Sequence, residues 1–162
     1  MKRLASRCQG KYWESLVLDT SYVLPFLGVQ VKGVDAQQLI ELFKGFHLYY
    51  PATLLAELEG VVFKELRRKG LVELPSMVLE GFDSLIHGGE VEVLSPTSLE
   101  LKVIYDVVKE GWRDLFDAAA YAAAVRVDGP LLTMDMEFKT FLDERGFDSF
   151  RLLSHKELPR LR

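Results

Sequence analysis

The sequence predicts an α/β fold of three layers, in which helices cover both faces of a central, mostly parallel sheet of about five strands. Two observations carry this prediction. Short runs of aliphatic and β-branched residues alternate along the whole chain with longer segments whose apolar residues recur at helical spacing. Apolar residues make up 49% of the 162 residues, which is enough to build the core of one ordinary domain.

The first predicted strand, 15–19, is apolar until it stops at Asp19, and the hydroxyls of Thr20 and Ser21 are suited to cap the helix that follows. Asp35 is expected to cap a helix over 36–44. A strand over 47–50 comes next, and Pro51 is expected to end it and to open a long helix that runs to about 69.

In the second half, helices are expected over about 76–86, 97–110, 115–127 and 137–144, with strands over 91–94, 131–133 and 150–153. Asp114 is the expected cap of the alanine-rich helix 115–127. Residues 71–90 are expected to form an insertion or a helical arm. We divide the chain into a basic lead-in (1–14), a single domain (15–155) and a basic tail (156–162).

The net charge of −4 is the main objection to a nucleic-acid partner. A surface patch can nevertheless be basic. Lys2, Arg3, Arg7 and Lys11 precede the first acid, and Arg151, Lys156, Arg160 and Arg162 crowd the other end, so both ends are candidates for steering an anionic polymer. We interpret the bases at 67–69 as complementing a helix C-terminus.

A cytoplasmic, reducing location is expected, because the single Cys8 leaves no disulfide framework and no cysteine cluster for zinc. The N-terminal segment lacks the apolar core of a signal peptide. No apolar run reaches the roughly 18 residues that a membrane span needs, so no membrane partner is expected.

Four acids are candidates for one site. Asp19 and Asp135 each follow a predicted strand, so in a parallel sheet both lie at the same edge. Asp117 is in the first turn of the alanine-rich helix, whose small residues allow close packing on the sheet. Glu57 lies among apolar residues of its helix. For each acid a structural alternative stays open: Asp19 and Asp135 as helix caps, Asp114 in place of Asp117, and Glu59 in place of Glu57.

Clustered carboxylates repel one another and raise each other's pKa, and a divalent cation removes that repulsion. Mg²⁺ and Mn²⁺ prefer oxygen ligands, and such ions activate water and neutralise the charge on a phosphodiester. Thr20, Ser21 and Thr133 are candidates for holding waters or phosphate oxygens around the metal. The pattern therefore favours phosphodiester hydrolysis that depends on a divalent cation.

Four motifs in order resemble those of PIN-domain proteins over nearly the whole chain: Val17–Ser21, Ala56–Leu58, Asp117–Ala124 and Leu131–Asp135. The resemblance implies a PIN-like fold and a Mg²⁺- or Mn²⁺-dependent endoribonuclease in which Asp19, Glu57, Asp117 and Asp135 are the catalytic, metal-binding acids. It also implies an additional acid at Glu137, an RNA substrate and a homodimer. For toxin members of the VapC type it implies a small antitoxin partner, and other members process RNA.

The long lead-in and the expanded segment 71–90 depart from the minimal toxins of that family. They put the toxin role in doubt more than the nuclease chemistry. The alternative to a ribonuclease is a catalytically inactive PIN-like module that binds RNA or protein. A phosphatase that needs a second aspartate two residues after Asp19 is disfavoured by Ser21, and an adhesion-type metal site that needs a hydroxyl at position 23 is disfavoured by Val23.

Overall fold

The computed structural model describes residues 13–161, which form one five-stranded sheet in the order β3-β2-β1-β4-β5. Every pair of neighbouring strands is parallel. The predicted α/β architecture is confirmed, and the sheet is fully parallel. The strands are β1 (Ser15–Leu18), β2 (His47–Pro51), β3 (Val91–Leu94), β4 (Leu131–Leu132) and β5 (Leu152–Leu153).

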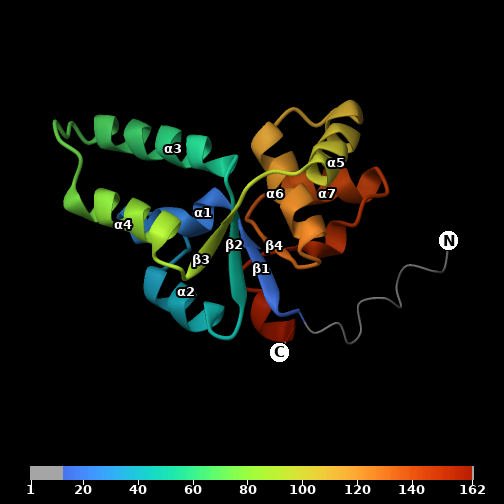
Figure 1. The fold of residues 1–162 in the computed structure, drawn as a ribbon, viewed down its shortest axis with the longest axis horizontal. Coiled ribbons are helices and arrows are strands. Elements are labelled where there is room, and N and C mark those ends of the chain that lie inside the picture. The colour runs from blue at the N-terminus through green and yellow to red at the C-terminus, as the bar shows by residue number, and fades with distance from the viewer. Residues whose placement is uncertain (1–12, 162) are drawn as a thin grey trace.

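Helices lie on both sides of this sheet, with α1 to α4 on one side and α5 to α7 on the other (Figure 1). The α-helices are α1 (Thr20–Val23), α2 (Ala36–Phe43), α3 (Leu54–Arg68), α4 (Ser76–His87), α5 (Ser98–Lys109), α6 (Leu115–Arg126) and α7 (Met136–Glu144). Three short 3₁₀ helices complete the fold: η1 (Leu24–Leu27), η2 (Ser149–Arg151) and η3 (Leu158–Leu161).

Strand β1 is central, and its carboxyl end is fixed to β4. Leu18 pairs with Leu132, and the backbone N–H of Asp19 donates to the carbonyl of Leu132 over 3.1 Å. The backbone N–H of Thr133 donates in turn to Leu153 of β5 over 2.9 Å. The residues that follow β1 and β4 are therefore held side by side at one edge of the sheet.

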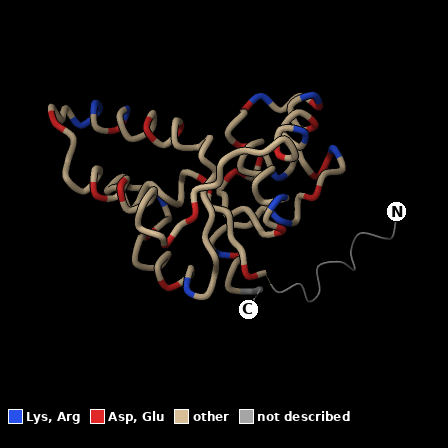
Figure 2. Tube along the Cα trace, in the orientation of Figure 1, with Lys and Arg blue, Asp and Glu red and all other residues tan. Residues whose placement is uncertain are grey.

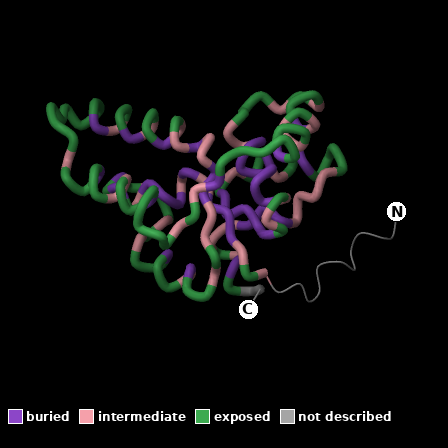
Figure 3. Tube along the Cα trace, viewed as in Figure 1, coloured by how far each residue is buried: buried purple, intermediate pink, exposed green. Residues whose placement is uncertain are grey.

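Helix α6 is buried along almost its whole length, as Figure 3 shows. Its small side chains allow the helix axis to approach the sheet closely, so that its first turn is carried to the edge where β1 and β4 end. The chain leaves α6 through Gly129, where an added Cβ would lie 2.7 Å from the carbonyl oxygen of Ser15. The buried residues of the helix are Ala118, Ala119, Ala120, Tyr121, Ala122, Ala123 and Ala124.

Helices α3 and α4 extend together away from the sheet as a helical arm (Figure 1), as expected for the segment 71–90. Their inner faces bury Leu58, Val62, Val78 and Leu85. Lys and Arg lie along α3 together with acidic residues, whereas the charged residues of α4 are all acidic (Figure 2). Arg67 and Arg68 occupy the last turn of α3, where positive charge complements the helix dipole, as the sequence predicted.

Three local predictions were wrong. Pro51 is the last residue of β2, and α3 begins only at Leu54 after a short turn. The cap of α1 is Asp19 itself, because its carboxylate accepts the N–H of Thr20. Residues 150–151 belong to η2 and not to a strand, so β5 is restricted to two residues.

Arg151 was expected to help steer an anionic polymer, and the structure shows otherwise. Its side chain is buried, with 7% of the residue exposed, and donates to Asp148 and to the carbonyls of Ala124 and Gly129. The guanidinium thus joins the end of α6 to η2 and does not face solvent. Lys156 is exposed. The basic lead-in residues up to Lys11, Cys8 and the side chains of Arg160 and Arg162 lie outside the described residues.

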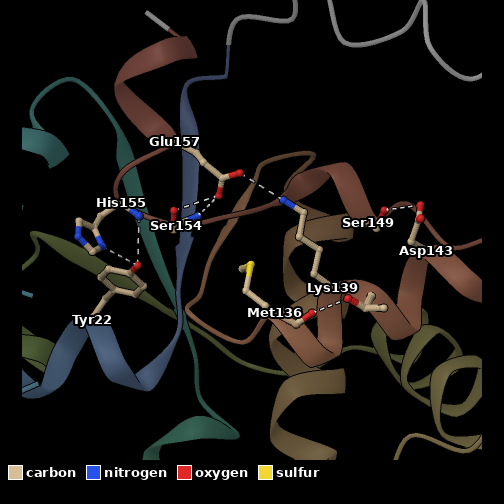
Figure 4. Close-up of polar contacts among 9 residues, drawn as sticks. Tyr22, Met136, Lys139, Asp143, Ser149, Ser154, His155 and Glu157 are labelled. Carbon is tan, nitrogen blue, oxygen red and sulfur yellow. Dashed lines mark hydrogen bonds and ion pairs between the residues drawn. The ribbon is translucent and has the colours of Figure 1, made fainter. Parts of the chain in front are cut away.

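The end of β5 is tied to the start of α1 (Figure 4). The backbone N–H of His155 donates to the hydroxyl of Tyr22 over 3.1 Å, and the same hydroxyl lies 3.0 Å from His155 Nδ1. Glu157 accepts the N–H of Ser154 over 2.8 Å, and Leu158 is buried in the core. The division of the chain at residues 15 and 155 remains a prediction.

Phe46, Phe82 and Trp112 are all half-buried. The large apolar residues that are most exposed lie elsewhere, at Val72 between α3 and α4 and at Leu101 and Tyr105 on α5. Within the described residues, none of the helices combines the length and the apolar character that crossing a bilayer requires.

Candidate acidic site

Asp19 lies directly after β1, and three donors hold its carboxylate. Its Oδ1 accepts the N–H of Thr20 over 2.8 Å, and its Oδ2 accepts the hydroxyls of Ser21 over 3.2 Å and Thr133 over 3.1 Å. Asp19 is both the cap of α1 and the centre of a hydroxyl network. The two interpretations left open by the sequence therefore do not exclude each other.

Glu57, in the first turn of α3, reaches the same place through a hydroxyl. The hydroxyl of Thr20 donates to Glu57 Oε2, and Thr20 Oγ1 lies 3.0 Å from the hydroxyl of Tyr50. Tyr50 is fully buried and donates to the carbonyl of Leu54 over 3.0 Å. Glu59 is exposed and lines a different, apolar pocket between α3 and α4. Of the two glutamates, Glu57 is the one that faces Asp19.

Asp117, in the first turn of α6, is half-buried, and its Oδ2 accepts the indole N–H of Trp112 over 3.1 Å. Asp114 is exposed and caps the helix, accepting the N–H groups of Phe116 and Asp117. The assignment of Asp114 as cap and Asp117 as the more buried acid follows the order expected from the sequence.

Asp135 caps α7, where its Oδ1 accepts the N–H of Phe138 over 2.8 Å. Its own N–H donates to Thr133 Oγ1 over 3.1 Å, so the buried hydroxyl of Thr133 connects Asp135 with Asp19. Glu137, two residues further along, is exposed, and none of the hydrogen bonds among the described residues joins its side chain to these acids.

The acids act on one another electrostatically. Burial raises the pKa of Asp19, and the charge of Asp135 raises it further against the hydrogen bonds that lower it. Burial likewise raises the pKa of Glu57, with a contribution from Asp19. The pKa of Asp117 is raised to about 7 by burial and then by the charges of Asp114, Asp135 and Asp19. Four segments of the chain therefore bring negative charge to one region.

The donor types in this region suit a hard divalent cation, because all are carboxylate oxygens and their mutual repulsion is what a cation relieves. Among residues 13–161, however, no three acids, histidines or cysteines already stand in an arrangement that could hold a metal ion. In three of the acids one oxygen is engaged locally: Glu57 by Thr20, Asp117 by Trp112 and Asp135 by Phe138. The second oxygen of each has no hydrogen bond to another described residue.

Sequence reasoning missed two side chains that belong to this network. Tyr50 was considered only as a strand residue and Trp112 only as a break between helices. Tyr50 holds Thr20, and Trp112 donates to Asp117. Neither side chain stands in a spacing that marks it in the sequence, because both act through hydrogen bonds that only the fold brings together.

Comparisons with known proteins place this fold in a class. No family model matches the chain, and no curated protein matches its sequence. Among solved structures, PAE2754 from Pyrobaculum aerophilum is similar with a TM-score of 0.59 and 20% identity, over 95% of this chain and 93% of that chain. VapC20 from Mycobacterium tuberculosis, a toxin that cleaves the sarcin-ricin loop, is similar with a TM-score of 0.55 and 18% identity, over 83% of this chain and 97% of that chain.

The fold is therefore the PIN-domain fold of VapC-like proteins, as the sequence motifs predicted. At 18–20% identity the likeness concerns the fold, and the chemistry has to be argued from the acids themselves.

Proposed function

We propose that this protein is an endoribonuclease that depends on Mg²⁺ or Mn²⁺ and hydrolyses RNA phosphodiester bonds at Asp19, Glu57, Asp117 and Asp135. The observation that carries the proposal is the crowding of these acids at the carboxyl edge of the sheet, where Asp19 is linked to Asp135 through Thr133 and to Glu57 through Thr20. Such crowding is unfavourable unless a cation or a proton neutralises it.

Asp19, Glu57, Asp117 and Asp135 would hold the ion. When bound, it would supply an activated water and neutralise charge on the phosphate. The hydroxyls of Thr20, Ser21 and Thr133 fix the direction of the carboxylates. Hydrolysis consumes one water, breaks one P–O bond and leaves a phosphate on one fragment and a hydroxyl on the other. Glu137 is exposed at the start of α7, and we propose that it lies outside the group of acids that hold the ion.

RNA is the proposed substrate because VapC20, which shares the fold, is described as cleaving the sarcin-ricin loop. From the resemblance of the four motifs to PIN-domain proteins we also propose a homodimer and, if the protein is a toxin, a small antitoxin partner. The cytoplasmic location expected from the single cysteine is part of the same proposal. The long lead-in and the helical arm depart from the minimal toxins. An RNA-processing enzyme is therefore as well supported as a toxin. Residues 15–155 are proposed as the nuclease domain, flanked by the two basic ends.

A cleavage assay on structured RNA with Mg²⁺ or Mn²⁺ tests the proposal. Glu57→Gln is the informative variant, because Glu59→Gln is a matched control on the same helix with an exposed carboxylate. We expect E57Q, and likewise D19N, D117N and D135N, to lower the rate by at least about 100-fold, while E59Q cleaves like the wild type. Equal rates for E57Q and E59Q would refute the assignment.

Thermal unfolding separates this proposal from the alternative of an inactive binding module. A metal-binding nuclease unfolds at a higher temperature in Mn²⁺ than in EDTA, and D19N loses that stabilisation. An inactive module shows no metal-dependent shift and no cleavage, while it still binds RNA or protein. The metal-dependent shift in unfolding temperature can be measured without knowing the natural RNA target.

A further inference from the structure

Trp112 lies in the turn between α5 and α6 and makes a single directed polar contact. Its indole N–H donates to Asp117 Oδ2 over 3.1 Å. The ring itself is packed against two aromatic rings of α7, Phe138 at 4.8 Å and Phe141 at 5.1 Å between centroids. The two ring pairs are tilted, at 33° and 41°. Because these contacts hold the plane of the indole, they also fix the direction in which the N–H points.

The same packing connects Trp112 to a second acid of the site. Phe138 is buried, and its ring also contacts Tyr121 of α6 edge-on at 6.2 Å. The backbone N–H of Phe138 donates to Asp135 Oδ1 over 2.8 Å. A continuous path of contacts therefore runs from Asp135 through Phe138 and Trp112 to Asp117, and it joins the first turns of α6 and α7.

We propose that Trp112 is a positioning residue that holds Asp117 at a fixed place relative to Asp135, with Oδ2 bound to the indole and Oδ1 left for a divalent cation. This inference rests on the proposed function and deepens it. A neutral donor suits the task. A lysine or arginine in the same place would neutralise Asp117 itself and would compete with the cation, whereas an indole N–H orients the carboxylate without doing so.

The packing alone does not require a tryptophan. A phenylalanine could occupy the space between Phe138 and Phe141, so the feature that distinguishes Trp112 is the N–H group. The chain contains one other tryptophan, Trp13, whose buried Nε1 has no hydrogen-bond partner among the described residues. Trp13 precedes β1 and so lies at the opposite end of that strand from Asp19. It is a matched control for the loss of an indole N–H.

The test measures Mn²⁺ affinity directly, by electron paramagnetic resonance of the free ion, in the full-length protein. We expect Trp112→Phe to raise the Mn²⁺ dissociation constant about 10-fold, and Trp13→Phe to change it less than 2-fold. In a D117A background, W112F is expected to cause no further loss, because the acid that the indole orients is already absent. A purely structural role would lower the unfolding temperature of W112F without this dependence on Asp117.

A second measurement does not need the W112F variant to fold. The two indole N–H groups give two resonances in a ¹H–¹⁵N NMR spectrum. Asp117→Ala is expected to shift the Trp112 resonance and to leave that of Trp13 in place. An unmoved Trp112 resonance in D117A, or W112F that binds Mn²⁺ as tightly as the wild type, would overturn the positioning role while the proposed function stands. A wild-type protein that binds no Mn²⁺ would overturn both.

Discussion

The hydroxyl of Thr133 holds the carboxylate of Asp19, donating to its Oδ2 over 3.1 Å from a position 114 residues further along the chain. The hydroxyl oxygen of Thr133, Oγ1, also accepts the backbone N–H of Asp135 over 3.1 Å. One buried side chain therefore sets the relative position of two acids that follow neighbouring strands. Leu18 and Leu132 pair in register, and this pairing brings Thr133 within hydrogen-bonding reach of Asp19.

Replacing Thr133 by valine is expected to remove both contacts while it keeps the volume of the side chain. RNA cleavage should fall about 10- to 100-fold, because Asp19 loses a partner that orients it. The free energy of unfolding should fall by about 1–2 kcal/mol, because a buried N–H loses its acceptor. Thr140→Val is the control, since Thr140 donates only to the carbonyl of Met136 on an exposed face of α7. Equal cleavage by the two variants would contradict the role of Thr133.

The metal-free protein is expected to become more stable as the pH falls from 8 toward 5. Asp19, Glu57 and Asp117 have folded-state pKa values above their ordinary values, about 7 for Asp117. The folded protein therefore binds protons more tightly than the unfolded chain. Stability gained this way is complete near pH 4 and is lost as the pH rises through the folded-state pKa.

Urea unfolding in EDTA at several pH values measures this effect. The informative quantity is the difference between the wild type and D117N, because other groups such as His155 also titrate in this range. Removing the acid should flatten the curve by on the order of 1–2 kcal/mol, after allowance for partial exposure of Asp117. Identical pH dependence of the two proteins would show that neither burial nor the neighbouring charges raise the pKa of Asp117 in the folded protein.

Arg151 is expected to matter for stability and not for RNA binding. Replacing it with methionine leaves Asp148 and the carbonyls of Ala124 and Gly129 without their donor, which should cost about 3 kcal/mol in urea unfolding. Arg68→Met removes an exposed pair with Glu65 and should leave the free energy of unfolding nearly unchanged, because solvent screens that pair. A folded R151M protein with selectively weakened RNA affinity would restore the role first expected from the sequence.

Much of the fold could be predicted because its signals are local. Strands such as β1 are short aliphatic runs, and caps such as Asp35 and Asp114 mark the start of the helices that follow them. The prediction failed where tertiary contacts override local preference. Phe150 and Arg151 read as strand, yet Arg151 turns inward to cap the end of α6, and the chain follows it into η2.

The acids of the site could be predicted from their positions after strands and in first helical turns. The residues that form hydrogen bonds with these acids could not be predicted, because contacts between distant segments produce no periodic pattern in the sequence. Thr20 reaches Glu57 across 37 residues, and Tyr50 and Trp112 carry no spacing that marks them. The sequence also left open whether Glu57 or Glu59 faces Asp19. That choice depends on the orientation of α3, which only the structure gives.

The central claim is that the four acids share one divalent ion, and a crystal structure of the protein soaked in Mn²⁺ tests it most directly through the anomalous signal of the metal. We predict a peak at the carboxyl edge of the sheet, coordinated directly or through water by Asp19, Glu57, Asp117 and Asp135. A peak bound elsewhere on the surface, or no peak at this edge in saturating Mn²⁺, would contradict it.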